Sequence, residues 1–384
     1  MSQSVQLLVG TRKGAFIYSS DAARQCWTLS EPLLPGWQIN HMAADLRDGR
    51  RRLYAAANHW AWGPSVARSD DGGETWEQRS PGLAFPADMG LSIANVWHVE
   101  PGHASQPGVV YAGTQPGALF RSEDWGESWT PVDGLTRHKY RQFWGPTGSV
   151  GDSSLHSIQV DPRDPNRLYA SISSGGTYFS EDGGDQWDLC SHGIVVTTPA
   201  AKAFLAEIAE SFPQPELPPD VDPAAMDEFH KFLIDPKNPD RLWGQSHVGV
   251  FRSDCRGKGW EDVTHGLPSF HGFPIAITRR QPDAVFVVPI EYGADNFRVV
   301  RGQFAVWRSG DGGKSWQPLS DGLPGPHDYQ SVYREGLDTD GLEPEGVYVG
   351  TSNGQVFASS NGGDCWQRLP GTLPPILSIT CAVS

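Results

Sequence analysis

The side chains of this chain that are best suited to chemistry are its twelve histidines. Many of them lie near the start of short apolar segments. Aligning these segments on the turn that follows them places four polar residues in equivalent positions: Asn40, Asn95, His156 and His230. His41 and His98 lie close to this set. Because three neutral imidazoles suit a divalent transition metal that keeps one position open, His156 and His230 with His98 or His41 predict a metal site.

A second set of side chains could hydrolyse a glycosidic bond. This reaction usually needs two carboxylates on opposite sides of the bond, and a variant of it uses a tyrosine nucleophile with a carboxylate partner. In that variant an arginine binds a carboxylate of the substrate. The candidate catalytic residues are Asp152, Glu291, Tyr292, Arg141 and Asp328.

Further polar and aromatic side chains are candidates for binding the substrate. They are Asn40, Asn95, His59, Trp60, His247 and Arg12. An exposed tryptophan such as Trp60 could stack on a sugar ring, and it could equally anchor a protein partner.

A repeated unit must position these residues. The stretch RSDDGGETW (Arg68–Trp76) recurs as RSEDWGESW, FSEDGGDQW, RSGDGGKSW and ASSNGGDCW, and degenerate copies end at two further tryptophans. Aligned on its last residue, the repeat ends at Trp27, Trp76, Trp129, Trp187, Trp260, Trp316 and Trp366. These tryptophans lie about 50 to 70 residues apart, near the length of one four-stranded propeller blade.

Each unit contains apolar strands that alternate with turns rich in glycine, proline and aspartate. The chain begins in a second strand, VQLLVGT, and its last segment, ILSITCAVS, is a first strand without a second. Joining the two completes a seventh blade. The sequence therefore predicts an all-β, seven-bladed propeller of four-stranded antiparallel blades over residues 1–384, closed by the C-terminal strand and the N-terminal strands.

The repeated stretch itself is expected to be structural. An aspartate such as Asp71 accepts hydrogen bonds in a turn, Gly73 tolerates a positive φ, and Trp76 buries a large apolar area. A calcium site needs several converging oxygen ligands, whereas each copy offers one or two carboxylates. We therefore predict a hydrogen-bonded corner between the third and fourth strands of each blade.

The motif S-x-D-x-G-x-[ST]-W resembles the Asp-box, or BNR repeat, of sialidase-like and sortilin-like propellers. Similar boxes occur in xyloglucanase-like glycosidases and in a photosystem assembly factor, so the resemblance implies a fold rather than one activity. The Phe-Arg-Ile-Pro signature of sialidases is missing, and the nearest stretch, HGFPIAIT, has no arginine. Sialidases also typically have six blades. The resemblance implies a glycosyl hydrolase type of propeller rather than a true sialidase.

The order of the strands assigns each loop to a face. If the first strand of each blade runs downward, the repeated corners lie at the bottom and the long insertions lie at the top. In residues 194–228, Pro199 fits the first position of a helix whose apolar stripe includes Phe204, Leu205 and Ile208. We predict a helical, proline-rich cap over one side of the top face. Long loops on one face of a rigid scaffold predict one site there, at the mouth of the central channel.

Composition narrows the partners and the compartment. The net charge of -15 argues against binding to nucleic acid. The N-terminus lacks the pattern of a signal peptide, and no apolar stretch reaches membrane-spanning length. The five cysteines show no CxxC spacing, so free thiols are expected. These features predict a cytoplasmic protein that binds neither membrane nor nucleic acid.

The predicted function is that of a carbohydrate-active or related small-molecule enzyme, of the glycoside hydrolase or lyase type, with or without a histidine-bound divalent metal ion. The alternative is a non-catalytic scaffold that binds a protein partner on the same top face. Convergent ionisable groups at the channel mouth favour the enzyme, and a shallow apolar surface there favours the scaffold.

Overall fold

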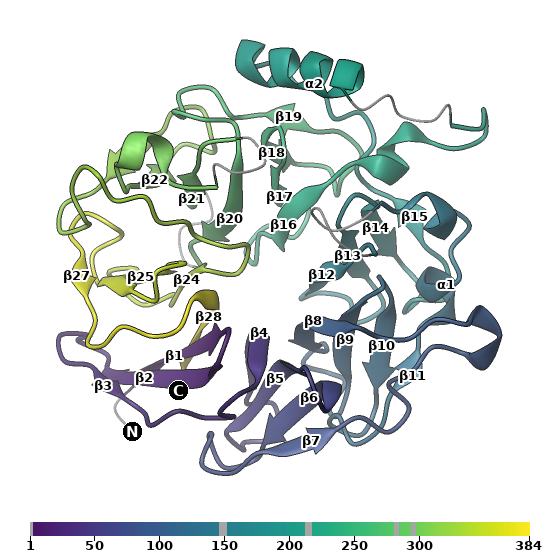
Figure 1. Cartoon of the computed structure of the whole chain (residues 1–384), viewed down its shortest axis with the longest axis horizontal. Helices are drawn as coiled ribbons and strands as arrows, with labels where there is room; N and C mark the ends of the chain where they lie inside the picture. The colour runs from purple at the N-terminus through teal and green to yellow at the C-terminus, as the bar shows by residue number, and fades with distance from the viewer. Residues whose placement is uncertain (1–2, 146–151, 212–216, 280–283, 293–296) are drawn as a thin grey trace.

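The computed structural model describes residues 3–145, 152–211, 217–279, 284–292 and 297–384. Within these ranges the chain forms seven four-stranded antiparallel sheets. Figure 1 shows the sheets arranged as blades around a central axis. The predicted all-β, seven-bladed propeller is confirmed.

Six blades are built from consecutive strands. The first three are β4 (Gln38–Asp45), β5 (Arg52–His59), β6 (Gly63–Ser69) and β7 (Glu77–Arg79); β8 (Asn95–Pro101), β9 (Val110–Gln115), β10 (Leu119–Ser122) and β11 (Thr130–Pro131); and β12 (Leu155–Val160), β13 (Leu168–Ile172), β14 (Gly176–Ser180) and β15 (Asp188–Leu189). The next three are β16 (Phe229–Ile234), β17 (Leu242–Ser246), β18 (Gly249–Ser253) and β19 (Glu261–Asp262); β20 (Gly272–Ile277), β21 (Val285–Pro289), β22 (Val306–Ser309) and β23 (Gln317–Leu319); and β24 (Leu337–Thr339), β25 (Val347–Gly350), β26 (Val356–Ser359) and β27 (Gln367–Arg368). The first strands of successive blades contact one another around the axis.

The seventh blade joins the two ends of the chain. It contains β28 (Ile376–Val383), β1 (Ser4–Thr11), β2 (Gly14–Asp21) and β3 (Thr28–Leu29), in that order across the sheet. β28 pairs antiparallel with β1, with Val5 opposite Val383. The N–H of Ser4 also donates to the carbonyl of Ser384 at 2.9 Å. The ring is therefore closed by its own terminal strands, as predicted.

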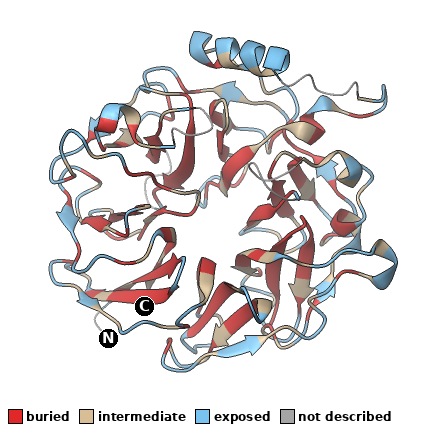
Figure 2. Cartoon of the chain, in the orientation of Figure 1, coloured by how far each residue is buried: buried red, intermediate tan, exposed pale blue. Residues whose placement is uncertain are grey.

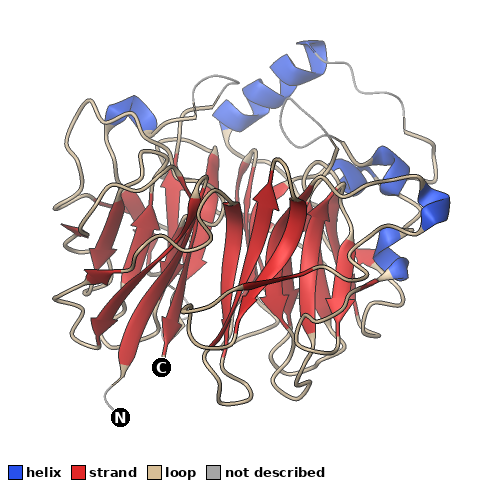
Figure 3. Ribbon diagram, turned by 60° about the horizontal axis from the view of Figure 1, so that its bottom comes forward, coloured by secondary structure: helices blue, strands red, loops and turns tan. Residues whose placement is uncertain are grey.

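Helices are few and short in the described ranges. They are α1 (Asp133–Thr136), α2 (Pro199–Ser211) and the 3-10 helices η1 (Ala87–Met89), η2 (Arg141–Phe143), η3 (Pro223–Met226) and η4 (Val300–Gly302). Figure 3 shows α2 lying across one end of the ring, with both termini at the other end. We call the end that carries α2 the top. No described helix is long and apolar enough to cross a membrane.

The corner between β6 and β7 shows why the repeated stretch recurs. Ser69 Oγ donates to Asp71 Oδ1 at 2.7 Å and accepts the N–H of Gly73 at 2.8 Å, while the N–H of Thr75 donates to Asp71 Oδ1 at 2.9 Å. The same pattern recurs in the corners that contain Asp124, Asp182 and Asp311. Asn361 accepts the equivalent N–H at 3.0 Å, so the corner needs an oxygen acceptor and not a negative charge. The predicted hydrogen-bonded corner is confirmed.

The core lies between the blades. Figure 2 shows that the strands are largely buried, with exposed residues concentrated in the loops and on α2. The tryptophans that end the repeats contribute to this core, and Trp129, Trp187 and Trp366 are all buried. Gly73 has a φ of 101°, and a Cβ there would lie 2.9 Å from Ile17 in the neighbouring blade. The corner thus closes against the next blade as well as turning the chain.

Candidate functional site

β-Bulges in the innermost strands decide which side chains line the central channel. The register shifts fall between Ile39 and His41 in β4, Val96 and His98 in β8, Leu155 and Ser157 in β12, and Phe229 and Lys231 in β16. A bulge sets two residues opposite one, so that neighbouring side chains can share a face of the sheet. Asn40 and His41 accordingly line two different cavities of the channel, and so do Trp97 and His98.

These registers correct one part of the sequence alignment. Trp97, and not Asn95, occupies the bulge position equivalent to Asn40, His156 and His230. The Glu100–Pro101 pair resembles the Asp–Pro turn of other blades, but β8 continues through it to Pro101. Asn95 lies at the start of the strand, where its Nδ2 donates to Gln115 Oε1 at 2.8 Å.

The upper chamber is a cavity of about 200 Å³. It is lined by Arg12, Gln38, Asn40, Trp97, His156, Tyr333, Arg334, Glu335 and Leu377. Gln38 donates to Asn40 Oδ1 at 2.9 Å, and Asn40 in turn donates to the carbonyl of Val96 at 2.9 Å. The chamber thus combines two aromatic rings with amide, cationic and carboxylate groups, a mixture that suits a polar ring such as a sugar.

The lower chamber is larger, about 530 Å³, and strongly charged. The acidic, basic and imidazole side chains on its wall are His41, Asp45, Arg47, His98, Glu100, Lys231, Arg279, Glu335 and Asp338. It is formed by the lower halves of the innermost strands, below the mouth at which the sequence predicted the site. Glu335 lines both chambers, so it is the side chain that the two cavities share.

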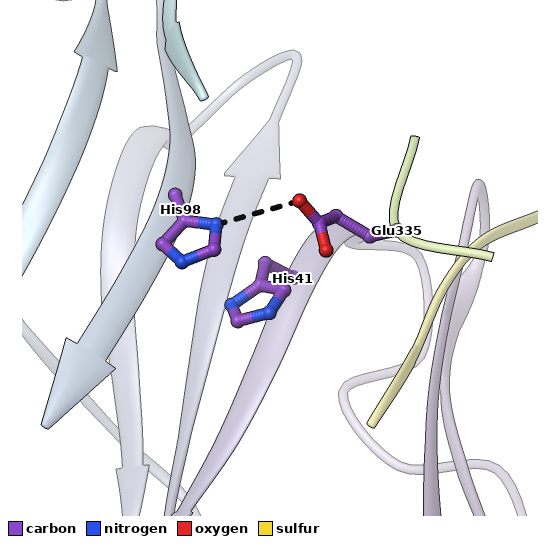
Figure 4. A group of neighbouring side chains, drawn as sticks. All are labelled: His41, His98 and Glu335. Atoms are coloured by element: carbon purple, nitrogen blue, oxygen red, sulfur yellow. Dashed lines mark ion pairs between the residues drawn. The ribbon is translucent and has the colours of Figure 1, made fainter. Parts of the chain in front are cut away.

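Glu335 is surrounded by one ammonium and two imidazoles. Its Oε2 lies 2.7 Å from Lys231 Nζ, and its Oε1 lies 3.8 Å from His98 Nδ1, the pair drawn in Figure 4. His98 Nε2 lies 3.5 Å from Glu100 Oε2. His41 stacks on His98 with ring centroids 3.9 Å apart. His98 therefore stands between two carboxylates on the wall of one cavity.

The two carboxylates have opposite electrostatic environments. Burial raises the pKa of Glu100 to about 7, and the negative charge of Glu335 adds to the rise. Burial also acts to raise the pKa of Glu335, but Lys231 and then His98 and His41 outweigh it and hold the value at about 2. The side chain of Glu100 is 32% exposed toward the cavity, so water there moderates its shift. Near neutral pH, one carboxyl is therefore partly protonated and the other is ionised.

The histidines beside these carboxylates are neutral near pH 7. Burial lowers the pKa of His41 to about 3 and that of His98 to about 4. His41 Nδ1 lies 3.0 Å from the carbonyl of Val99, which fixes the proton on that nitrogen. Neither ring nitrogen of His98 has a hydrogen-bond partner among the described residues.

A second cluster of ionisable groups lies toward α2. It consists of Glu228, His230 and His247, with His271 packed against both histidine rings. His230 Nε2 lies 3.0 Å from His247 Nδ1. Burial acts to raise the pKa of Glu228, but His247, His230 and Arg334 outweigh it and hold the pKa well below its usual range.

The structure divides the four histidines of the predicted metal set. His41 and His98 group with Glu335, whereas His230 groups with Glu228 and His247. His156 belongs to neither group. It is only 2% exposed, and neither of its ring nitrogens has a hydrogen-bond partner among the described residues. Burial, followed by the charge of Arg334, lowers its pKa to about 3.

None of the five predicted catalytic residues lines either chamber in the described part of the channel. Arg141 donates to the carbonyls of Gly117 and Thr136, and it lies over the rings of Phe85 and Trp144. Arg141 is therefore held by local packing and carbonyl groups.

The other four predicted catalytic residues also have local partners. Glu291 pairs with Arg298 at 2.9 Å, and the ring of Tyr292 packs on Phe204 and Phe270. Asp328 accepts a hydrogen bond from the side chain of Gln330. Asp152 is exposed, and its backbone carbonyl accepts from Gln115 at 2.9 Å. The structure does not bring these carboxylates together.

The predicted substrate-binding residues fall into three places. Arg12 and Asn40 line the upper chamber. Asn95, His59 and Trp60 line a neighbouring cavity of about 650 Å³ at the top, which also includes Arg12. Trp60 is 93% exposed and stacks on His59. His247 belongs to the cluster beneath α2.

Sequence reasoning missed Glu335, Lys231, Glu100 and Trp97. One signal could have found Glu335, because it lies five residues before the turn residue Asp340, as His156 precedes Asp161 and His230 precedes Asp235. In each case the N–H of this aspartate donates across the turn to the carbonyl of the residue just before the next strand. Lys231 and Trp97 could not be placed without the bulges.

No protein-family model matches the sequence. A probable oligoxyloglucan-reducing end-specific xyloglucanase of Neosartorya fischeri is 26% identical over 222 residues, which cover 57% of this chain and 23% of that protein. A xyloglucanase of a Paenibacillus species is 25% identical over 288 residues, covering 68% of this chain and 24% of that protein. The chain thus spans about a quarter of the length of the curated relatives that it matches.

Among solved structures, the chain is similar in fold to the GH74 enzyme of Niastella koreensis. The TM-score is 0.61 at 16% sequence identity, and the match covers 94% of this chain and 51% of that one. At this level of identity the likeness shows the fold alone. The chain is therefore a seven-bladed propeller with xyloglucanase-like relatives.

Proposed function

We propose that this protein is a glycoside hydrolase that cleaves an oligosaccharide inside the central channel. The observation that carries the proposal is the pair of glutamates, Glu100 and Glu335, on either side of His98 in a cavity of about 530 Å³. The similarity to xyloglucanases supports a carbohydrate substrate, and xyloglucan oligosaccharides are the first substrates to test.

The chemistry follows from the different environments of the two carboxyls. Glu100 is the general acid that protonates the oxygen of the leaving sugar as the glycosidic bond breaks. Glu335 is the ionised carboxylate that either takes a proton from the attacking water or attacks the anomeric carbon itself. Lys231 keeps Glu335 ionised through its contact at 2.7 Å. Water supplies the hydroxyl group and the proton that balance the reaction.

The upper chamber supplies contacts for neighbouring sugar units. Trp97 and Tyr333 place aromatic rings on its wall, which suit contact with a pyranose, and Asn40 and Arg12 offer polar groups for the hydroxyls of the sugar. Glu335 lies on the walls of both chambers. A sugar unit bound in the upper chamber would therefore place its glycosidic bond in the lower chamber, near Glu335 and Glu100.

The test is hydrolysis of xyloglucan oligosaccharides by the full chain, measured as new reducing ends. We expect Glu335→Gln and Glu100→Gln each to lose at least about 100-fold in kcat, the usual contribution of one acid or base group. Glu335→Asp keeps the charge beside Lys231 and shows whether the position of the carboxylate matters. The matched control is Glu123→Gln, an exposed glutamate paired with Arg121 on a bottom corner.

Two results would overturn the proposal. One is the absence of hydrolysis of every oligosaccharide by folded wild-type protein. The other is loss of activity in Glu291→Gln with full activity in Glu335→Gln, which would move the reaction to the rim that the sequence first indicated.

We also infer that the repeated corners are Asp-boxes. The support is the shared set of hydrogen bonds among the serine, aspartate and glycine of each corner, followed by a buried or partly buried tryptophan. Replacing Asp124 by Asn, as the chain itself does at Asn361, should leave stability nearly unchanged, whereas Asp124→Ala should lower the midpoint of thermal unfolding.

A further inference from the structure

The cluster of Glu228, His230 and His247 has the dimensions of a metal site. His230 Nε2 lies 3.0 Å from His247 Nδ1 and 3.7 Å from Glu228 Oε1, and His247 Nδ1 lies 3.6 Å from Glu228 Oε2. A tetrahedral zinc ion with ligands at about 2.0 to 2.1 Å sets neighbouring ligand atoms about 3.3 Å apart. We propose that these three side chains bind one divalent transition-metal ion of the zinc class beneath α2.

Hydrogen bonds already orient the ligands of this site. His230 Nδ1 donates to the carbonyl of Gly272 at 2.6 Å, so Nε2 carries the free lone pair on the side of His247. Donation of the second ring nitrogen to a backbone carbonyl is the usual arrangement of a metal-binding histidine. Glu228 is held by Ser173 Oγ at 2.7 Å and Ser174 Oγ at 3.1 Å, which fixes the carboxylate toward the two imidazoles.

A third imidazole, that of His271, packs against the two proposed histidine ligands. His271 is 1% exposed, and its Nε2 has no hydrogen-bond partner among the described residues. Its ring centroid lies 4.8 Å from that of His247 and 5.3 Å from that of His230. Its Nδ1 donates to the carbonyl of His247 at 3.0 Å, which again leaves Nε2 as an acceptor. A buried polar atom without a partner calls for an explanation, and this one lies in a ring packed against both proposed histidine ligands.

The site differs from the group of His41, His98 and Glu335 in that serine hydroxyls hold its carboxylate, whereas Glu335 Oε1 has no hydrogen-bond partner among the described residues. In that group the ammonium of Lys231 already lies 2.7 Å from Glu335 and supplies the positive charge. At Glu228 the cation present is Arg334, which contacts Oε1 at 3.1 Å. The other oxygen, Oε2, faces His247 and accepts from Ser174. One carboxylate and two imidazoles match the preference of zinc-class ions for nitrogen and oxygen ligands.

The ion would also be accessible from solvent. The side chain of His247 is 43% exposed, and with Glu228 it lines a cavity of about 300 Å³ beneath α2. Phe204, Leu205 and Ile208 of α2 form the apolar side of this cavity, and Phe204 stacks on His247. Three protein ligands leave a fourth position for water or for a small oxygen-donor ligand that enters under the helix. The inference is independent of the hydrolase proposal.

The test is a titration of the metal-free full chain with Zn²⁺ and with Co²⁺, whose visible absorption reports tetrahedral coordination. We expect one equivalent to bind. His247→Ala, at an accessible position, should weaken binding at least about tenfold, since loss of even an outer-shell partner of a ligand costs that much. His265→Ala, an exposed histidine that contacts Thr197, should bind as wild type. Thermal unfolding of His247→Ala should match wild type, which separates loss of a ligand from loss of the fold.

Three results would overturn the proposal. The first is the absence of stoichiometric binding of either ion to folded wild-type protein. The second is unchanged affinity in both His247→Ala and Glu228→Gln. The third is loss of binding in His41→Ala with retention in His247→Ala, which would assign the ion to the lower chamber instead.

Discussion

Glu100 and Glu335 lie on the wall of the same cavity, yet their surroundings shift their pKa values in opposite directions. The difference arises from Lys231, which contacts Glu335 directly at 2.7 Å, while Glu100 has its contact with the neutral ring of His98 at 3.5 Å. Two carboxyls with different protonation states are the requirement for acid and base roles in one reaction. The chemistry proposed for the channel therefore depends on four side chains, those of Glu100, Glu335, Lys231 and His98.

The rate of hydrolysis should depend on pH through these two groups. Glu100 must be protonated, so kcat/KM should fall as the pH rises through about 7, and Glu335 must be ionised, so the acid limb should lie near pH 2. Besides Glu335, the charged or titratable groups that act on Glu100 are His41, Arg47, Lys231 and His98. The histidines are neutral at the alkaline limb and become protonated only as the pH falls toward the acid limb, because their pKa values are about 3 to 4. A pH–rate profile of the wild type checks both limbs.

Lys231→Gln is the sharper form of this experiment. Removal of the ammonium takes away the charge that lowers the pKa of Glu335, so the acid limb should move to higher pH. An acid limb that stays in place in Lys231→Gln would contradict the assignment of Glu335. The alkaline limb should also move upward, because Lys231 lowers the pKa of Glu100 as well.

The buried neutral histidines should make the protein sensitive to acid. The pKa values of His41 and His156 are about 3 and that of His98 is about 4 in the folded state, against about 6.5 when unfolded. Their contribution to stability is therefore complete above pH 6.5 and is lost as the pH falls through the folded-state values of about 4 and about 3. Each such group lowers the free energy of unfolding by about 1.4 kcal/mol per pH unit in this window.

Urea unfolding at several pH values measures this slope. His156→Leu removes a histidine whose ring nitrogens lack partners, so it should flatten the slope by about one proton, with little or no loss of stability at pH 7. A slope in His156→Leu equal to that of the wild type would show that His156 is not protonated on unfolding.

At the scale of the elements, each blade combines a fixed corner with a variable innermost strand. The corner is determined locally, since Ser69, Asp71 and Gly73 lie within five residues of one another. This is why the repeat predicted the number of blades and the positions of the turns. The innermost strands depend on bulges, and the sequence contains no local signal that distinguishes the Glu100–Pro101 pair in β8 from a turn.

The residues that contact the histidines also could not be predicted from the sequence. Glu335 lies in the sixth blade and meets His98 of the second blade only because the ring closes. The sequence found the histidines by their repeated position, but it placed the carboxylates in the top loops. In the structure those loop carboxylates have local partners, as Glu291 has in Arg298.

The repeated tryptophans should stabilise the propeller by packing between neighbouring blades. Trp129→Ala should lower the free energy of unfolding by about 3 to 5 kcal/mol, because Trp129 is 2% exposed and its removal leaves a cavity. Trp60→Ala is the control, since Trp60 is almost fully exposed and its loss should change the free energy little. Urea denaturation of both variants measures the difference. Equal effects in the two would contradict the role of the corner tryptophan.

At the scale of the whole molecule, the ring holds the site because its two ends meet. Thr380 Oγ1 of β28 donates to the carbonyl of Met42 in β4, so the closing strand also contacts the blade that carries His41. Residues Ile379 to Val383 form part of the wall of the lower chamber. The strand that closes the ring, β28, therefore also shapes the lower chamber.

Removal of residues 376–384 should expose the edge of β1 and destroy cooperative unfolding, because an unpaired strand in an open ring has no partner. A circular permutant that joins Ser384 to Ser4 through a short linker, with new ends between Gly90 and Leu91, should unfold as cooperatively as the wild type. Gly90 has no neighbouring atom within 4 Å of its Cβ position, so a break there disturbs little. Calorimetry of the two proteins tests closure, and a stable truncated protein would contradict it.

The most direct test of the proposed chemistry is the crystal structure of Glu335→Gln with a bound xyloglucan oligosaccharide. We expect one sugar unit in the upper chamber against Trp97 and Tyr333, with a glycosidic oxygen in the lower chamber on the side of Glu100. An oligosaccharide bound at the rim beside Glu291 and Asp328, with both chambers empty of sugar, would contradict a catalytic site in the channel.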